Sequence, residues 1–484
     1  MTDVDVVIIG AGIAGLSAAK TIADAGCTFR ILEASHRIGG RAYSEPYARG
    51  GMFDLGCSYL HEGDTNPLKP VAAALGIELG NGDRFAREEW RLLADGKPRA
   101  DSDHTEYWDF ANDVDHRMHL LGDDITRDTD IGDLMNWDSP VAPLYVHLMA
   151  GLNASDVTEQ SAVDYMRSGF GRDYPVRGGL GSLIAKWGAD IPVTLNCRVS
   201  AVDMTGRDVT VTSNQGELRA RRVIMTVSTG ILAAGDILFT PALPDTVTTA
   251  IDHLPCGTLN KIGVALSQGA VPPDADGWHL AWPDHHTGAL PADQIASVDI
   301  YTGAHPQAVV FAGASFGIHL EKAGAAAMRN YAEDSLISIF GSDIRNAIDG
   351  MITTAWHSEP LTLGSYSYAR PGGADARRVL QHPVDDRLYF AGEASSIAHY
   401  GTAHGAFLSG QDAGQRVAAG IIAKETGVSL QPCHLPQHCR DRPAPPIRFA
   451  ASPHVQDASP DACGVPRQVW TPVLAERHGN QSRL

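Results

Sequence analysis

Three glycines and one glutamate near the start of the chain have the types and spacing of a dinucleotide-binding loop. Gly10, Gly12 and Gly15 follow the apolar run 5–9, and Glu33 ends the next apolar run. We expect Gly10 to make the tight turn, Gly12 to let the backbone approach a pyrophosphate, and Gly15 to allow close helix–strand packing. Glu33 would accept hydrogen bonds from the ribose hydroxyls of an adenosine. The pattern predicts a bound dinucleotide and leaves FAD and NAD as alternatives.

These residues need a parallel strand–helix–strand unit to position them. Residues 5–9 predict a buried strand, and a helix should begin at Ile13 and end near Ala25, before Gly26. The start of that helix would direct N–H groups and partial positive charge at the phosphates. Further along, apolar runs and turn signals predict more elements. These are strands over 28–32, 193–195, 209–211, 222–225 and 388–390, a turn at 214–216, and helices over 107–121 and 403–423.

Size and charge narrow the class of protein. The chain has 484 residues, enough for two or three domains, and a formal net charge of -19. A negative surface argues against nucleic acid as a partner and suits cationic small molecules. No apolar stretch reaches the ~18 residues of a membrane span, and no secretory signal precedes the first strand, so we expect a cytoplasmic protein. Seven scattered cysteines argue against a disulfide framework.

Two clusters allow more than one interpretation. Between Asp101 and Asp138 twelve acidic residues stand against Arg117 and Arg127. This stretch is either a solvated helical face or a negative field near a substrate entrance. The second cluster is a Cys-His pair at 433–434 followed by a His-Cys pair at 438–439. These residue types can bind a metal ion, but the segment is proline-rich, so we expect no metal there.

The next motif separates FAD from NAD. Gly39-Gly40-Arg41 follows the second strand closely, and this resembles the extended FAD fingerprint of the flavin-dependent amine oxidases. The resemblance continues from residue 5 to about 424. It rests on the blocks 54–61 with 66–67, 178–183 with 198–199, 226–228 with 239–241, 390–393, 401–406 and 409–410.

The resemblance implies an amine oxidase architecture of the α/β class. A Rossmann-type (GR2-like) FAD-binding domain would comprise 1–77, 187–241 and 383–424. An α+β substrate-binding domain would comprise 78–186 and 242–382, and 425–484 would be a proline-rich tail. The residues implied to contact FAD are Gly10, Gly12, Ile13, Ala14, Gly15, Glu33, Ala34, Gly39, Gly40, Arg41, Leu55, Gly56, Cys57, Ser58, Val199, Gly392, Glu393, Gly401, Thr402 and Ala403.

Five residues are implied to act on the substrate. Lys261 matches the family lysine that holds a water near the reactive flavin nitrogen, although by itself it would be an exposed lysine opening a strand. Trp356 and Tyr366 match positions that line the cavity, with Tyr366 as one wall of an aromatic cage. For Trp356 a plain core position is the alternative. Thr402 replaces the opposite tyrosine of monoamine oxidases, which favours a longer substrate. His61 matches a histidine that touches the substrate in polyamine oxidases.

Some neighbouring positions carry weaker implications. Glu62 could pair with a distal ammonium group of a polyamine, and His399 and His404 flank the second flavin block. Ser365 stands where monoamine oxidases have the cysteine that attaches FAD, so the FAD should be non-covalent.

The predicted function is oxidation of an amine to an imine, polyamine oxidase-like, with hydride transfer to flavin and oxygen as the acceptor that yields hydrogen peroxide. An L-amino-acid oxidase is an alternative and would need a cavity arginine, for which Arg167, Arg172 and Arg370 are available. Two further hypotheses are a desaturase on the same fold and a flavin-binding scaffold that recognises another protein. The expected partners are an amine and oxygen, with the chain a monomer or homodimer.

Overall fold

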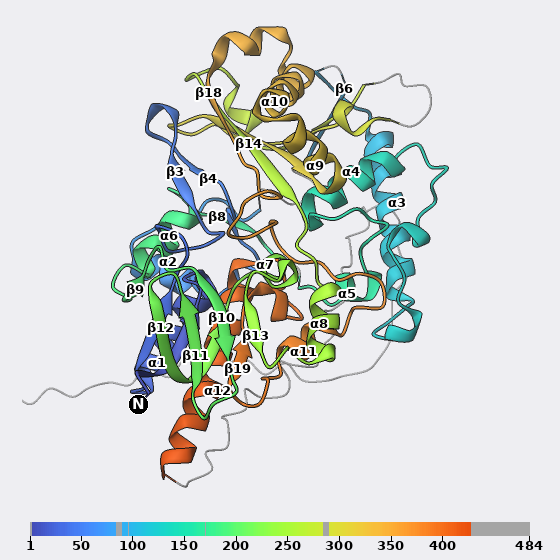
Figure 1. The fold of residues 1–484 in the computed structure, drawn as a ribbon. Coiled ribbons are helices and arrows are strands. Elements are labelled where there is room, and N and C mark those ends of the chain that lie inside the picture. The colour runs from blue at the N-terminus through green and yellow to red at the C-terminus, as the bar shows by residue number, and fades with distance from the viewer. Residues whose placement is uncertain (1, 84–89, 95, 170, 284–289, 427–484) are drawn as a thin grey trace, which may run out of the picture. The chain divides into compact units, whose positions relative to one another are not determined.

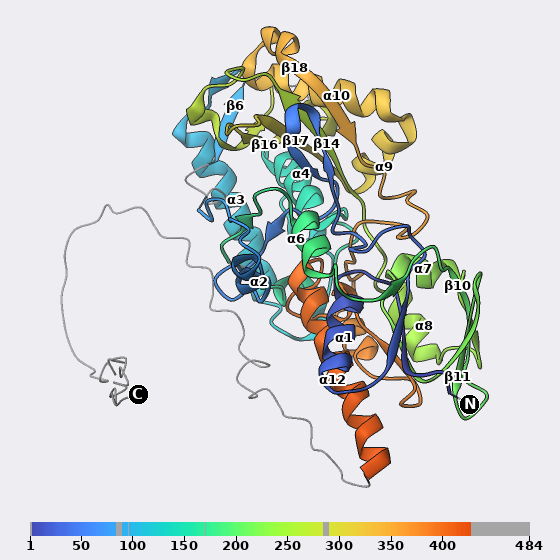
Figure 2. The ribbon, with the colours of Figure 1, turned by 90° about the vertical axis from the view of Figure 1, so that its left-hand side faces the viewer.

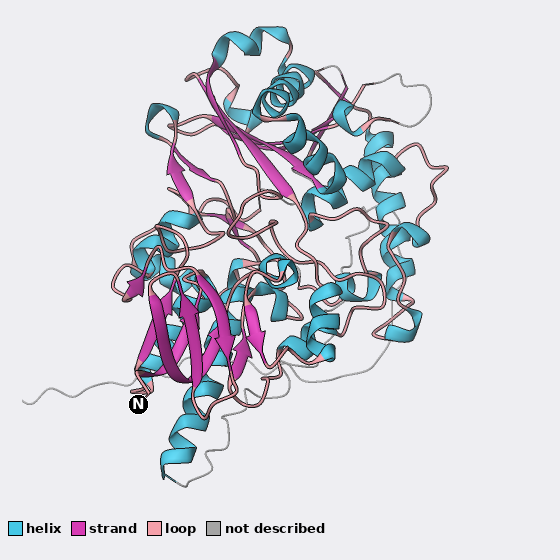
Figure 3. Cartoon of the chain, in the orientation of Figure 1, coloured by secondary structure: helices cyan, strands magenta, loops and turns pink. Residues whose placement is uncertain are grey.

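The structure, a computed structural model, describes residues 2–83, 90–94, 96–169, 171–283 and 290–426. Most of the described strands gather in two sheets, which Figure 3 shows as separate groups of arrows. The first sheet has the strand order β13-β10-β11-β12-β1-β2-β9, with β19 beside β12. Its strands are β1 (Val4–Ile9), β2 (Phe29–Leu32), β9 (Val193–Thr194), β10 (Val199–Asp203), β11 (Val209–Ser213), β12 (Gly216–Met225), β13 (Leu238–Thr240) and β19 (Leu388–Phe390).

The central strand β1 is apolar along most of its length because both of its faces are covered. Val6 and Ile8 belong to one buried cluster, and Val7 and Ile9 belong to another on the opposite face. Strands of this kind are typical of parallel sheets with helices on both sides. β1 pairs in parallel with β2 and β12, whereas β10, β11 and β12 form an antiparallel meander.

Two helices lie side by side on one face of this sheet, as Figure 2 shows. They are α1 (Ile13–Asp24) and α12 (Ala403–Thr426). Gly410 permits their close approach, because a Cβ atom there would lie 2.1 Å from the carbonyl oxygen of Ala14. Residues near the end of the described chain are therefore packed against the first helix of the glycine loop.

The second sheet is mainly antiparallel and has the order β18-β14-β17-β16-β15-β6-β7. Helices α9 (Ala314–Ala323) and α10 (Ala325–Phe340) pack against it (Figure 1). Its strands are β6 (Arg91–Ala94), β7 (Lys97–Pro98), β14 (Leu259–Leu266), β15 (Gly277–Ala281), β16 (Ala296–Tyr301), β17 (Gln307–Gly313) and β18 (Ile348–Thr353).

The remaining elements connect the sheets or cover them. The short strands are β3 (Ser44–Pro46), β4 (Met52–Asp54), β5 (Tyr59–Leu60) and β8 (Tyr174–Pro175). The helices are α2 (Leu68–Ala74), α3 (Asp101–His119), α4 (Ala142–Asn153), α5 (Ala162–Met166), α6 (Leu180–Trp187), α7 (Thr229–Ala234), α8 (Asp245–Asp252) and α11 (Ala376–Leu380). None of the described helices is long and apolar enough to cross a membrane.

The predicted elements of the first sheet are confirmed, with helix α1 ending one residue before the expected Ala25. All strands of the first sheet lie within 1–77, 187–241 and 383–424, and all strands of the second lie within 78–186 and 242–382. The domain boundaries themselves stay a prediction. The segment 427–484, with the Cys-His pairs of 433–439, lies outside the described residues.

The acidic stretch 101–138 contains the predicted helix, α3, which buries Tyr107, Phe110, Val114 and Met118. None of its twelve acidic residues, all of which the structure describes, lines the cavity described below. The interpretation as a solvated face therefore fits better than a field at a substrate entrance.

Candidate active site

A cavity of about 1010 Å³ is lined by residues that both large sheets and the loops beside them supply. The glycine loop between β1 and α1, the segment 55–59, strand β14, the segment 353–366 and the start of α12 all contribute. A cavity of this size, apolar with a few placed polar groups, is typical of a cofactor and substrate site.

The glycine loop has the geometry that a dinucleotide needs. Gly10 has a φ of +104°, and a Cβ atom on Gly15 would lie 2.0 Å from the Gly10 carbonyl oxygen, so the turn and the close helix packing both require glycine. Gly12 and Gly392 line the cavity, and a Cβ atom on either would meet no protein atom within 4 Å. The backbone there is open to a phosphate, so the site fits FAD.

Glu33 holds the end of β2 against the glycine loop. Its Oε2 atom accepts the N–H of Ala11 at 2.6 Å, and its Oε1 atom accepts the N–H of Ser35 at 2.7 Å. Glu33 is buried and lines the cavity, where its carboxylate can also accept hydrogen bonds from ribose hydroxyls.

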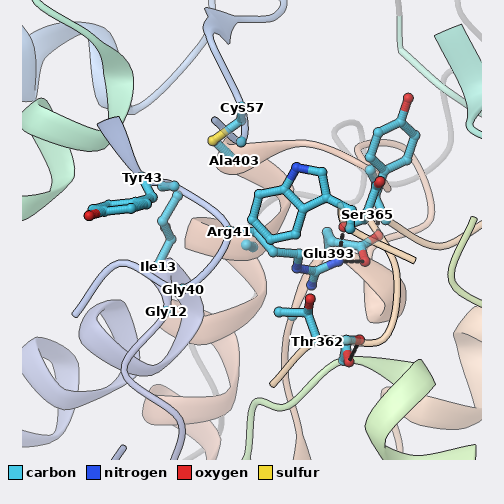
Figure 4. Close-up of a pocket in the computed structure, with 18 of the residues that line it drawn as sticks. Gly12, Ile13, Gly40, Arg41, Tyr43, Cys57, Thr362, Ser365, Glu393 and Ala403 are labelled. Carbon is cyan, nitrogen blue, oxygen red and sulfur yellow. Dashed lines mark hydrogen bonds and ion pairs between the residues drawn. The ribbon is translucent and has the colours of Figure 1, made fainter. Parts of the chain in front are cut away.

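Arg41 reaches from the second glycine segment to residues near the end of the described chain (Figure 4). Its guanidinium donates to Glu393 Oε1 at 2.9 Å and to the carbonyl of Ser365 at 2.7 Å. Glu393 also accepts from Ser367 Oγ at 2.7 Å and from the N–H of Gly401 at 2.9 Å. Burial favours the neutral acid, but Arg41 and these donors outweigh it, so the pKa of Glu393 lies below its ordinary value.

Lys261 is buried, which corrects the alternative of an exposed lysine. It lies on β14, and its Nζ donates to Ser58 Oγ at 2.6 Å, to the carbonyl of Asp54 at 3.2 Å and to the carbonyl of Gly56. Burial lowers the pKa of Lys261, and the Asp54 carboxylate opposes part of that shift. The lysine therefore fixes a cation beside the segment that the resemblance places along the flavin.

Trp356 and Tyr366 both line the cavity. The Trp356 indole N–H donates to the carbonyl of Leu55 at 3.0 Å, so the ring is fixed against the same segment that Lys261 holds. The Tyr366 hydroxyl donates to the carbonyl of Leu152 at 2.7 Å, and the ring packs over Gly401. Burial raises the pKa of Tyr366, which keeps this phenol neutral.

Thr402 also stabilises the start of a helix, a role that the sequence prediction did not include. Its hydroxyl donates to the carbonyl of His399 at 2.7 Å and accepts the N–H of Gly405 at 3.0 Å. It therefore caps the start of α12. The residue still lines the cavity, with a side chain smaller than the tyrosine that the resemblance gives for monoamine oxidases.

Two carboxylates line the cavity beside histidines. Asp173 Oδ1 lies 3.0 Å from Nδ1 of His61, and burial of the imidazole is outweighed by Asp173 and then Glu62, so the pKa of His61 is raised. Glu62 Oε1 accepts from Nδ1 of His399 at 2.7 Å and from Nε2 of His404 at 3.2 Å. Although burial disfavours its charge, these two bonds lower the pKa of Glu62 to about 2.

The three ligand atoms of Glu62, His399 and His404 lie within 4.8 Å of one another, which is close enough for a shared metal ion. Both histidines already hydrogen-bond one oxygen of this carboxylate, Oε1. His399 and His404 thus contact Glu62 directly, which the sequence did not predict.

Of the predicted site residues only Gly15 does not line the cavity, because its place is in the packing of α1 against β1. Ser365 uses its hydroxyl within the protein, accepting from the N–H of Leu259 at 2.7 Å and donating to its carbonyl at 3.1 Å. The cavity is also lined by residues that the sequence did not predict, namely Asp173, Trp90, Trp278, Phe311 and Arg37. Arg37 donates to the carbonyl of Gly40 at 2.9 Å.

Known proteins resemble this chain over most of its length. The family described as flavin containing amine oxidoreductase matches residues 13–418. Probable polyamine oxidase 4 of Arabidopsis thaliana is 29% identical over 448 residues, covering 85% of this chain and 86% of that protein. Lysine-specific histone demethylase 1 homolog 3 of Oryza sativa subsp. japonica is 26% identical and covers 88% of this chain but 56% of the relative.

A solved structure shares the fold. Cyclohexylamine oxidase from Brevibacterium oxydans IH-35A superposes with a TM-score of 0.72 at 22% identity, covering 87% of this chain and all of that one. The predicted amine oxidase architecture is thereby confirmed. Because the family match spans most of the residues that build the cavity, the chain belongs to the flavin-containing amine oxidoreductases, with FAD as its non-covalent cofactor.

Proposed function

We propose that this enzyme oxidises a polyamine or similar primary or secondary amine to an imine, with oxygen as the acceptor that becomes hydrogen peroxide. One observation supports this most strongly. Lys261 and Tyr366 line the same cavity as the carboxylates of Glu62 and Asp173. An ionised carboxylate in a partly desolvated cavity attracts a second ammonium group of a di- or polyamine.

When bound, FAD supplies the acceptor for a hydride equivalent from the carbon beside nitrogen. The protein's own residues have to orient the amine and exclude water. Tyr366 and Trp356 are each held by a hydrogen bond to a backbone carbonyl, so their rings form fixed walls. Lys261 places a cation by the segment 54–58, where it can stabilise negative charge that develops nearby.

The arginine positions argue against an amino-acid oxidase. Arg167 pairs with Asp375 at 3.0 Å, Arg172 is more than half exposed, and neither lines the cavity. Arg370 does not line it either, and donates to a backbone carbonyl. Among the described residues, the cavity arginines are Arg37, Arg41 and Arg198, each already paired with protein groups.

The desaturase alternative is weaker because it would not require Lys261 or the aromatic wall. A flavin-binding scaffold that only recognises another protein would not need the buried Lys261 or the ordered walls of the cavity. A cytoplasmic location and a monomeric or homodimeric state stay predictions.

The pH profile should depend on His61. Below its raised pKa the imidazole is positive and repels a cationic amine, so kcat/KM should rise as the pH increases through that pKa, above the ordinary 6.5. In Asp173→Asn, the loss of the carboxylate should move this inflection to lower pH. In His61→Asn, the inflection should vanish. A profile identical in all three proteins would contradict the assignment.

The proposal can be tested with purified enzyme in air by following peroxide formation. Putrescine, spermidine, spermine, benzylamine and a panel of L-amino acids serve as candidate substrates. We expect peroxide from amines and none from amino acids. Peroxide from amino acids alone would reject the proposed substrate class. Flavin reduction by amines without peroxide would reject oxygen as acceptor.

A further inference from the structure

We propose that Glu62, His399 and His404 form a binding site for a divalent cation of the zinc class, and that the bound ion inhibits the oxidation of diamines. The site itself does not depend on the proposed function, whereas the inhibition rests on it. Two imidazoles and one carboxylate are ligand types that Zn²⁺ accepts in proteins, and three protein ligands leave one coordination position open. Mg²⁺, by contrast, prefers oxygen ligands alone.

The three donor atoms lie close to the spacing that one ion requires. Glu62 Oε1 lies 2.7 Å from Nδ1 of His399 and 3.2 Å from Nε2 of His404, and all three atoms lie within 4.8 Å of one another. Donors around a tetrahedral zinc ion are about 3.3 Å apart, because each bond is about 2.0–2.1 Å long. Two of the separations are slightly below this value and the third is at most 4.8 Å. Modest rotations of the side chains therefore bring all three donors onto one ion.

Glu62 is held in place by an unusual backbone conformation. Its φ is +51°, in the left-handed region that few residues other than glycine adopt. Its side chain packs where two glycines leave space. A Cβ atom on Gly169 would lie 2.5 Å from Glu62 Oε1, and one on Gly171 would lie 2.9 Å from Glu62 Cα. Such a conformation costs free energy and persists only where the surrounding structure fixes it. The chain therefore fixes this carboxylate in front of the two imidazoles.

The start of helix α12 positions the two histidines. His404 is the second residue of the helix, and His399 lies in the loop before it. The Thr402 hydroxyl donates to the carbonyl of His399 at 2.7 Å and so fixes this turn. The N–H of Gly169 donates to the carbonyl of Ala398 at 2.7 Å, which ties the same loop to the segment that packs on the carboxylate. Backbone contacts therefore hold all three ligands before any ion binds.

The site has a buried side and an open side. The side chain of His404 is 3% exposed, whereas those of Glu62 and His399 are 16% and 29% exposed. An ion can therefore enter past His399 while His404 closes the inner side. Among the described residues, both hydrogen bonds to the Glu62 carboxylate go to Oε1, so Oε2 is also available to an ion.

An ion at this site changes the charge that a substrate meets. Glu62 lines the cavity, where its negative charge attracts the second ammonium group of a diamine. A divalent ion bound to this carboxylate makes the local charge positive and repels that group. A monoamine has no second ammonium group, so its oxidation should be affected less.

Calorimetry with zinc chloride tests the site without turnover. The FAD-loaded enzyme is first treated with a chelator and desalted. We expect one Zn²⁺ to bind per chain, and Mg²⁺ not to bind measurably. Glu62→Gln and His399→Asn should each weaken zinc binding at least about tenfold, because even the loss of a group that only orients a ligand costs about 10–100-fold. Mg²⁺ binding as tight as that of Zn²⁺ would contradict the role of the histidines.

His382→Asn is the matched control, because His382 is exposed and does not line the cavity. Its affinity for zinc should equal that of the wild type. A second measurement is the unfolding temperature, which an ion that binds only the folded chain raises. Zinc should raise it in the wild type and in the control but not in His399→Asn. If Glu62→Gln fails to fold, His399→Asn decides the question. No zinc binding, or equal binding in the wild type, Glu62→Gln and His399→Asn, would overturn the site.

Kinetics with putrescine and benzylamine test the inhibition. At saturating zinc, kcat/KM for putrescine should fall about tenfold and that for benzylamine by less than about twofold. A chelator should restore both, and His399→Asn should not respond to zinc. If no amine is oxidised, the proposed function fails while the calorimetry still decides the site. If amines are oxidised and zinc does not bind, the site fails and the function stands. Zinc binding that leaves putrescine oxidation unchanged would overturn the inhibition.

Discussion

Lys261→Met should lower the rate of the flavin half-reactions by about 10²-fold, the usual cost of removing one preorganised charge from a reaction site. The ammonium group is buried and is fixed by Ser58 and by the carbonyls of Asp54 and Gly56. Methionine can donate none of these hydrogen bonds, so the charge and its three contacts are lost together. Anaerobic reduction by an amine and reoxidation by oxygen, each followed by stopped-flow absorbance, measure the loss.

Two variants separate the charge from the packing. Lys261→Arg keeps a cation and should recover part of the rate. Lys322→Met removes an exposed lysine at the end of α9 and should leave both rates unchanged. Rates in Lys261→Met within about twofold of the wild type would show that the lysine only holds the segment 54–58 in place.

Arg377→Met should lower the free energy of unfolding by about 3–5 kcal/mol, because it leaves a buried carboxylate without its partner. Both side chains of the Arg377–Asp164 pair are 0% exposed, and Arg377 Nε lies 2.9 Å from Asp164 Oδ1. Arg377 also donates to Ser367 Oγ at 2.8 Å, and its guanidinium stacks on the Tyr400 ring at 3.8 Å. Ser367 in turn holds Glu393, so FAD binding should weaken as well.

Urea unfolding followed by flavin fluorescence measures this change. The neighbouring Arg378→Met is the control, because Arg378 is about half exposed and pairs with Asp375 at the surface. Its loss should cost less than about 1 kcal/mol. The double variant Arg377→Met with Asp164→Leu should be less destabilised than Arg377→Met alone. A loss in Arg377→Met no larger than in Arg378→Met would contradict the role of the buried pair.

The sequence was most informative where a few neighbouring residues determine the backbone conformation by themselves. The turn at Gly10, the packing at Gly15 and the start of helix α1 depend on residues within a few positions of one another. The identity of the cofactor needed one further motif, Gly39-Gly40-Arg41, and the resemblance that it carries. Local rules were sufficient for these features because the backbone conformation itself selects glycine.

Contacts between distant segments could not be predicted in the same way. Arg377 and Asp164 are separated by 213 residues, and Glu62 and His399 by 337. Phe311 and Trp278 line the cavity because of strand register, since a shift of one residue would turn either side chain to the other face of the sheet. One local signal was available, since Ser161 and Asp164 have the spacing of a helix cap, and Ser161 does cap α5.

The role of Thr402 shows how one residue can satisfy two constraints. The resemblance placed it on the cavity wall, and the structure adds that its hydroxyl caps α12. A larger aromatic residue there would give up the cap, so the smaller side chain on the cavity wall and the stable helix start follow from the same choice.

Anaerobic mixing of the FAD-loaded enzyme with single substrates, while the flavin absorbance is recorded, tests the proposed substrate class most directly. We expect di- and polyamines to bleach the flavin in one saturable phase, and L-amino acids to leave it oxidised. Bleaching by L-amino acids with no response to any amine would contradict the proposed function.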